Sequence, residues 1–298
     1  MSTYGALAPA GARETRKREN IINGCEGFQS TPEGRMDRCN CSSNGPSKMS
    51  ERSLIWWGRL GVIVVTICLW WLASVMVGRN LVPSPLATLQ AATGLFSKPE
   101  IYNAVLNSLG VYLAGMAIAI VIGLPMGLLA GGVPLLGRTL DPFFNALMAT
   151  PRVAFIPLII VLLGLGFQAK ITIVALGAVM PILINTYVGV RNGDAELVEM
   201  ARSAGASRMQ VFSKILMPGA ASFILVGLRL GATIGLINTV VAELYTAVQG
   251  LGGLLAIYGN TFRMAPYFVV VLILAGLGVA VTEVLRLFER RLDRWRRT

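Results

Sequence analysis

Few side chains of this sequence are of the types that carry out covalent chemistry. Its 298 residues include no histidine, which excludes a Ser-His-Asp triad, a histidine general base and His-ligated metal sites. Carboxylates are not paired at a catalytic spacing, and the ATP-binding pattern Gly-x-x-x-x-Gly-Lys-Ser/Thr does not occur. We therefore predict that the chain has no catalytic residue, no metal site and no cofactor.

Four polar side chains inside long apolar stretches are candidates for contact with a solute. They are Arg152, Asn185, Asn238 and Glu243. Charges inside membrane spans are costly and usually face a bundle interior or water. On one interpretation Arg152 faces a pathway and attracts an anion, while Glu243 lies at its outer gate. On the other, which we favour, Arg152 extends its charge to the inner membrane surface and Glu243 bonds to neighbouring backbone or to Arg229.

The polar segment 191–218 has the pattern of two short helices joined by a glycine. Asp194 is a good N-cap, and Glu196 places negative charge in the first turn, where the helix dipole favours it. One apolar face recurs at three- and four-residue spacing and comprises Leu197, Met200, Ala201 and Ala204. Gly205 follows at the position where a helix end favours a positive φ.

A second helix is predicted to begin at Ser207, which has the spacing of a capping box with Gln210. Its apolar side comprises Val211, Phe212, Ile215 and Leu216. Pro218 either ends this pattern or opens the next span. Three acidic residues lie in the first helix: Asp194, Glu196 and Glu199. Because an acidic helix suits an anionic membrane surface poorly, docking onto a soluble partner explains its apolar face better than lying on lipid.

The elements that position these residues are predicted to be membrane spans. Hydrophobic residues make up 54% of the chain and charged residues 14%, against about 25% charged in soluble domains. A helix that crosses a bilayer takes about 20 apolar residues. Six runs qualify: about 54–77, 104–130, 143–167, 171–190, 219–244 and 266–288. Pro151 and Pro157 break the third. The predicted fold class is an all-α polytopic membrane protein with six transmembrane helices and a cytoplasmic helix–Gly–helix loop between spans four and five.

Small residues at four-residue spacing bear on how these spans pack. Gly123-x-x-x-Gly127 and Gly227-x-x-x-Gly231 suit a close approach of two helices in a membrane. Such pairs also arise easily in glycine-rich apolar sequence, so the pattern by itself leaves both interpretations open.

Lys and Arg predict the orientation of the chain. They concentrate in residues 1–53, near Arg138, in 191–218 and after residue 288. The opposite loops hold only Arg79, Lys98, Lys170 and Arg263. This asymmetry places both termini in the cytoplasm. The net charge of +11 is thereby explained by topology and lipid contact rather than by nucleic-acid binding.

The first 53 residues differ from the rest of the chain. They are rich in Gly, Ser, Asn, Arg and Glu and poor in apolar residues, which predicts a disordered cytoplasmic tail. Three cysteines lie there, Cys25, Cys39 and Cys41, and reduced thiols are expected. The membrane domain is predicted to occupy residues 54–298.

The segment 191–218 also carries a family resemblance. Glu199-x-Ala201-x-x-x-Gly205, followed after nine residues by Ile215-x-x-Pro218, resembles the Glu-Ala-Ala…Gly…Ile-x-Leu-Pro loop of permease subunits in binding-protein-dependent ABC importers. The likeness continues through Gly227-Leu-Arg229, Ala242-Glu243 and Gly250-Leu-Gly-Gly253, and it is greatest to the nitrate, sulfonate and taurine class. Two departures are apolar: Met200 stands for the second motif residue and Met217 for the leucine before the proline.

The resemblance implies a division of labour among subunits. Permeases of this family form a dimeric pore in the cell membrane, with two ATP-binding subunits on the cytoplasmic side and a solute-binding protein outside. Segment 194–216 would be the coupling loop, with Glu199 and Ala201 packed at the ATPase, Gly205 at the corner, and Ile215 and Pro218 anchoring the second helix. The solute would be an organic sulfonate, nitrate or similar small anion. The alternative from the residues alone is a secondary transporter or channel that needs no ATPase.

Overall fold

The computed structural model describes residues 51–78, 80–246 and 249–296. The predicted tail and its three cysteines lie outside these ranges, except for the last three residues of the tail. The chain divides into two units, Met1–Trp57 and Gly58–Thr298, and the second contains the fold described below. Within the described ranges every regular element is a helix, as predicted. The elements are α2 (Glu51–Val77), α3 (Pro85–Phe96), α4 (Pro99–Gly132), α5 (Pro134–Ala149), η1 (Arg152–Phe155), α6 (Ile156–Leu163), α7 (Phe167–Arg191), α8 (Ala195–Ser203), α9 (Arg208–Val211), η2 (Phe212–Leu216), α10 (Met217–Thr246), α11 (Leu251–Asn260) and α12 (Met264–Arg296).

Five of these elements are single helices long and apolar enough to cross a membrane, and a bent pair supplies a sixth candidate. The five are α2, α4, α7, α10 with the turns that precede it, and α12. The bent pair is Pro134–Ala149 with Arg152–Leu163, whose axes differ by 78°. The break lies at Pro151, one of the two prolines that interrupt the predicted third run. Proline lacks a backbone N–H and forces the preceding residue out of the helical region, and Thr150 is extended, with ψ 126°.

Pro157, the other interrupting proline, does not break a helix. It lies in the first turn of α6, where proline is well tolerated because its missing N–H would have no helical acceptor. The third segment also begins earlier than predicted, since α5 starts at Pro134 rather than near residue 143. The predicted break at Pro151 is therefore confirmed and the one at Pro157 is wrong, and the segment starts about nine residues earlier than predicted.

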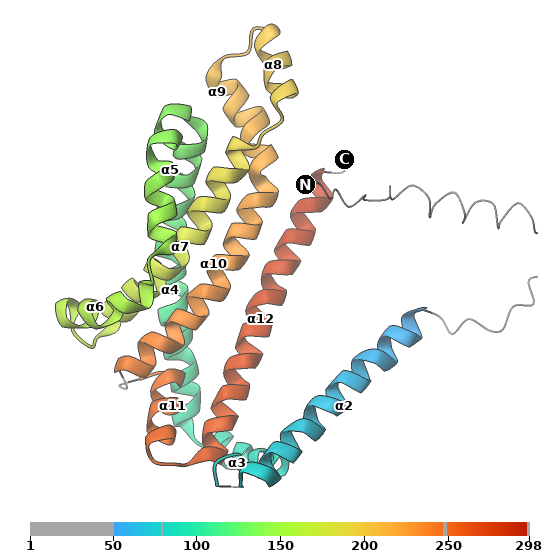
Figure 1. Cartoon of the computed structure of the whole chain (residues 1–298), viewed down its shortest axis with the longest axis vertical. Helices are drawn as coiled ribbons and strands as arrows, with labels where there is room; N and C mark the ends of the chain where they lie inside the picture. Colours follow the sequence, from blue (N-terminus) through green and yellow to red (C-terminus); the bar gives the residue numbers. More distant parts are fainter. Residues whose placement is uncertain (1–50, 79, 247–248, 297–298) are drawn as a thin grey trace, which may run out of the picture. The chain divides into compact units, whose positions relative to one another are not determined.

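Helix α7 lies between α4 and α10, and small residues line both contacts (Figure 1). A Cβ atom built at Gly127 of α4 would come 2.6 Å from the carbonyl oxygen of Leu183 in α7. A Cβ built at Gly231 of α10 would come 2.7 Å from the Ile182 side chain of α7. Both glycine pairs thus permit the close helix approach that the sequence suggested.

Two short helices, α3 and α11, were not predicted as helices. Ser84 caps α3 by accepting a hydrogen bond from the Ala87 N–H, and Pro85 occupies the first helical position. Neither helix is long enough to form an apolar run of spanning length. In Figure 1, α11 lies at the end of α10 opposite the pair α8–α9, and α3 lies near the foot of α12.

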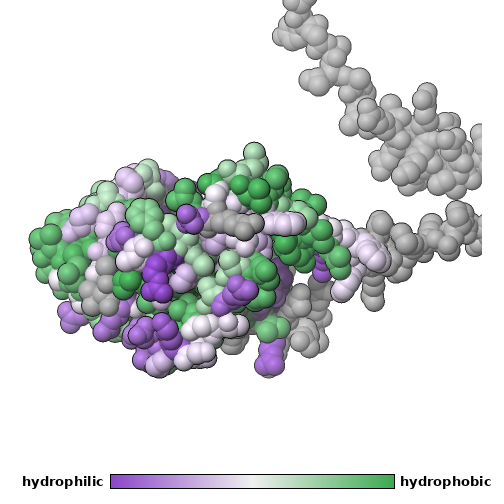
Figure 2. All heavy atoms as spheres, turned by 90° about the horizontal axis from the view of Figure 1, so that it is seen from below, coloured by the Kyte–Doolittle hydropathy of each residue, from purple (hydrophilic) through white to green (hydrophobic). Residues whose placement is uncertain are grey.

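Apolar side chains cover much of the outside of the described helices, as in a protein whose solvent is lipid. Exposed examples include Val121, Leu129, Val161, Leu162 and Leu272. Seen from the end where α3 and α11 lie, hydrophilic side chains gather near the middle of the face and hydrophobic ones reach its left and right margins (Figure 2). This distribution suits a helical bundle whose ends meet water and whose sides meet acyl chains.

Candidate functional site

The pair α8–α9 has the local structure that its sequence predicted. The Asp194 carboxylate accepts hydrogen bonds from the N–H groups of Glu196, at 3.0 Å, and Leu197, at 3.4 Å. Gly205 has φ +80°, the left-handed conformation that a side chain disfavours. Ser207 and Gln210 form both hydrogen bonds of a capping box. Local capping thus defines where each helix begins and where the chain turns between them.

The second helix of this pair is not separate from the following span. After α9 the chain passes through one π-helical turn, η2, directly into α10, so that Arg208–Thr246 is continuous. Pro218 therefore lies near the start of α10 within a longer helix and does not end one. The π turn accommodates it, because the Met217 N–H bonds to the Phe212 carbonyl five residues earlier. Of the two roles left open for Pro218, the structure shows the one that opens the span.

One face of α8 is apolar, and it is not fully covered by the described part of the chain. None of its residues is buried, and Met200 is 64% exposed and Met209 of α9 is 71% exposed. Between α8 and the start of α10 lies an open groove of about 650 Å³. Its lining is Leu197, Met200, Ala201, Ala204, Lys214, Ile215, Pro218 and Gly219. In contrast, Phe212 packs inward against Gly132 at the end of α4. The predicted apolar face exists and has no partner within the described part of this chain.

Glu243 lies in a buried polar network near the end of α10. Its side chain is 1% exposed, and both carboxylate oxygens accept from the Ser108 hydroxyl of α4 at 2.8 Å. One oxygen also accepts from the Gly252 N–H at 2.8 Å, and the Ser108 oxygen in turn accepts from the Leu251 N–H at 2.8 Å. The network fixes the start of α11 to α4 and α10. Glu243 does not pair with Arg229, which instead forms an ion pair with Glu289 of α12.

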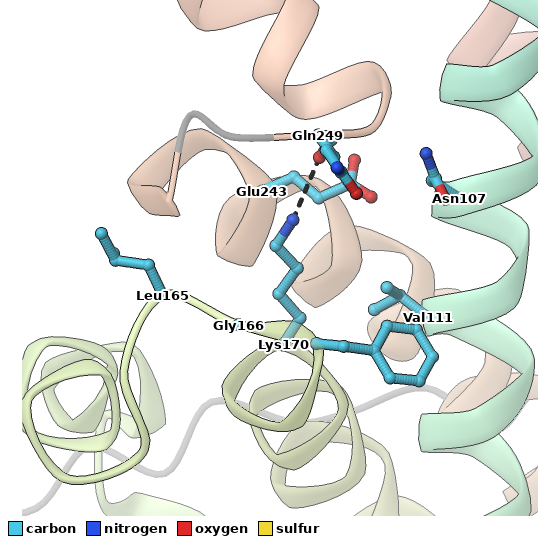
Figure 3. Close-up of a pocket in the computed structure, with 8 residues that line it drawn as sticks. Asn107, Val111, Leu165, Gly166, Lys170, Glu243 and Gln249 are labelled. Carbon is cyan, nitrogen blue, oxygen red and sulfur yellow. Dashed lines mark hydrogen bonds between the residues drawn. The ribbon is translucent and has the colours of Figure 1, made fainter.

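Lys170 joins the same region from α7. It is 5% exposed, and its ammonium group donates to the backbone oxygen of Gln249 at 3.1 Å (Figure 3). A cavity of about 220 Å³ lies between these groups and α4. Its lining is Asn107, Val111, Leu165, Gly166, Phe167, Lys170, Glu243 and Gln249. The sequence had assigned Lys170 only to an outer loop. A buried lysine opposite a buried glutamate becomes visible only when the helices are assembled.

The other three polar candidates lie in η1, α7 and α10. The Arg152 guanidinium donates to the Gly177 carbonyl at 3.0 Å, beside the middle of α7. A Cβ atom at Gly177 would collide with the side-chain amide of Asn238. Asn185 donates to the Pro181 carbonyl of its own helix at 2.8 Å. Arg152 and Asn238 therefore both contact Gly177 of α7, whereas Glu243 belongs to the separate network near the end of α10.

A bundle of apolar helices with polar groups at its centre, and a helix pair with an uncovered apolar face at one end, defines an integral membrane protein of the transport type. The comparison with known families agrees with this class of protein. Residues 119–294 match the model of the binding-protein-dependent transport system inner membrane component. The chain belongs to this family and is a permease subunit of an ABC importer, a multi-pass protein of the inner membrane.

Similar proteins carry more specific names. A putative aliphatic sulfonates transport permease protein, SsuC, from Bacillus subtilis is 31% identical over 81% of this chain and 88% of its own length. The taurine transport system permease protein TauC of Escherichia coli is 28% identical over 79% of this chain and 88% of its own. These relatives confirm the resemblance to the sulfonate and taurine class. Family membership does not favour the alternative of an ATPase-independent transporter or channel.

Solved structures share the fold. The crystal structure of an amino acid ABC transporter with histidines has a TM-score of 0.57 at 19% identity and covers 67% of this chain and 97% of its own. An inward-facing MetNI methionine ABC transporter has a TM-score of 0.56 at 22% identity, covering 63% and 94%.

Proposed function

We propose that this permease subunit forms the pathway for a small anion, an organic sulfonate or a similar acid, delivered by an extracytoplasmic solute-binding protein. The names of the similar permeases support the solute class. Arg152, a cation inside the bundle, suits such a solute. We further propose that both termini and the pair α8–α9 face the cytoplasm, which the distribution of Lys and Arg supports.

The single observation that carries the coupling role is the uncovered apolar surface of α8. No residue of α8 is fully buried within its own chain, and short helices are marginal in water unless an apolar face is buried. We propose that an ATP-binding subunit covers this surface, with Leu197, Met200 and Ala201 at the contact. Two copies of the chain would form the pore, each with its own ATPase subunit, and hydrolysis would take place in those subunits.

Gly205 provides the test. We expect Gly205→Val to lose the ATP-binding subunit on co-purification and to lose solute uptake, because a β-branched residue is strained at φ +80°. The matched control is Gly276→Val in α12, where a Cβ also meets open space but φ is not positive. Membrane insertion, followed by yield in washed membranes, should be the same for both. Normal ATPase retention by Gly205→Val would contradict the coupling role.

A second variant separates contact from backbone strain. Met200→Glu leaves the backbone of α8 unchanged but places a charge on its exposed apolar face, so it should weaken ATPase binding strongly. Arg202→Ala, about half a helical turn away on α8, should bind the ATPase like the parent chain. Uptake that proceeds with no ATP-binding subunit in reconstituted vesicles would instead support the ATPase-independent alternative.

A further inference from the structure

Pro181 leaves one carbonyl of α7 without its helical partner. In an α-helix the carbonyl of residue i−4 accepts from the N–H of residue i, and proline has no N–H. The carbonyl freed by Pro181 is that of Gly177. Inside a membrane an unsatisfied carbonyl is costly. The Arg152 guanidinium satisfies it, at 3.0 Å, from across the bend between α5 and α6.

The position of this hydrogen bond places a cation deep in the span. Gly177 is the eleventh of the 25 residues of α7, so at 1.5 Å per residue it lies roughly 15 Å or more from either helix end. The hydrocarbon core is about 30 Å thick. At that depth the guanidinium is far from both layers of lipid headgroups, which leaves a dissolved solute as its source of a counter-anion.

The charge of Arg152 is not balanced by the described part of the chain. Ion pairs there join Arg191 to Asp141, Arg229 to Glu289 and Arg286 to Glu283, and none includes Arg152. A guanidinium has five N–H donors in a planar fork, and only the bond to Gly177 is made among the described residues. Arg152 is half-buried, so the described part of the chain leaves part of its side chain uncovered.

Asn238 adds a second polar group at the same place. Its side-chain amide lies against Gly177, where a Cβ atom would leave it no room. Arg152 and Asn238 thus approach one residue of α7 from two other elements, η1 and α10. An amide beside a guanidinium supplies a neutral donor next to a charged one.

We propose that Arg152 and Asn238 form a binding site for a small oxyanion, a sulfonate or carboxylate, within the membrane span. Two oxygens of such a group match the fork of an arginine that is already held in place by the Gly177 carbonyl. Pro181 serves the site by freeing that carbonyl. The proposal rests on the proposed function for the identity of the solute, and it adds a contact inside the permease itself.

The test measures binding to the purified full-length permease, with its ATP-binding subunits, in detergent at low chloride. The probes are methanesulfonate and dimethyl sulfone, which has nearly the same shape but no charge. Methanesulfonate should bind the parent protein and dimethyl sulfone should not. Arg152→Gln should weaken methanesulfonate binding roughly 10- to 100-fold, because charge-assisted hydrogen bonds are lost. Arg191→Gln removes an exposed arginine from the end of α7 and should leave binding unchanged.

A double variant that includes Pro181→Ala distinguishes loss of the binding site from loss of binding through misfolding. This substitution restores the N–H that bonds to Gly177, so the helix no longer needs Arg152 for that role. In the Pro181→Ala background the protein should remain monodisperse after Arg152→Gln and should still fail to bind methanesulfonate. Parental binding by Arg152→Gln, or equal binding of the two probes, would overturn the proposal.

The same samples distinguish this inference from the coupling role. If methanesulfonate binds as expected but no ATP-binding subunit is retained, the coupling role fails and the anion site stands. If the ATPase is retained and methanesulfonate does not bind the parent protein, only the anion site fails.

Discussion

Replacing Glu243 by alanine is the sharpest test of how α4, α10 and α11 are held together at one end of the bundle. The substitution leaves two buried donors without an acceptor, the Ser108 hydroxyl and the Gly252 N–H. An unsatisfied buried donor costs about 1–3 kcal/mol, so the free energy of unfolding should fall by roughly 2–6 kcal/mol. For a protein of this size each kcal/mol shifts Tm by about 2–4 °C, which gives a drop on the order of 5–20 °C.

The assay is thermal unfolding of the purified permease in detergent, followed by intrinsic tryptophan fluorescence. Thr239→Val is the matched control, since Thr239 lies one turn away on α10, is equally buried, and bonds only within its own helix. It should change Tm by no more than a few degrees. Glu243→Gln keeps one acceptor oxygen and should fall between the two. If Glu243→Ala unfolded at the same temperature as Thr239→Val, the network would not hold α11 to α4.

Three further predictions follow from contacts described above. Gly127→Ala should destabilise the permease by about 1–3 kcal/mol because the new methyl group meets the Leu183 carbonyl, whereas Gly110→Ala on the same helix meets open space and should be neutral or slightly stabilising on thermal unfolding. Asp194→Ala should cost about 1 kcal/mol of local helix stability, seen as faster amide hydrogen exchange confined to α8. Arg229→Glu should lower Tm, and adding Glu289→Arg should restore part of the loss, because the two side chains form an ion pair; an additive loss in the double variant would contradict that pairing.

Features that depend on neighbouring residues could be predicted from the sequence. The caps at Asp194 and Ser207 and the positive φ at Gly205 each need only a few consecutive side chains. The break at Pro151 is equally local, because proline acts on its own turn. The spans follow from the length of each apolar run.

Features that depend on contacts between distant residues could not be predicted from the sequence. Ser108 and Glu243 are 135 residues apart, and nothing in either local pattern indicates that their helices meet there. The same holds for Arg152 and Gly177, although the proline four residues after Gly177 was a usable signal of a free carbonyl. The sequence left open whether α9 continues into α10, because Pro218 is equally compatible with the first turn of a new helix. The π turn that accommodates this proline does not change the hydrophobic pattern.

The continuous helix from Arg208 to Thr246 has a mechanical consequence. Its 39 residues extend roughly 58 Å at 1.5 Å per residue. They include the π turn η2 but no break, and α7 packs against the α10 part. Tilting the end near α8 would therefore move the opposite end in the opposite direction. Helix α8, by contrast, is connected to that continuous helix through the turn at Gly205. A force applied to α8 would therefore act on this helix at the end that begins at Arg208, and the buried network around Glu243 lies near its other end.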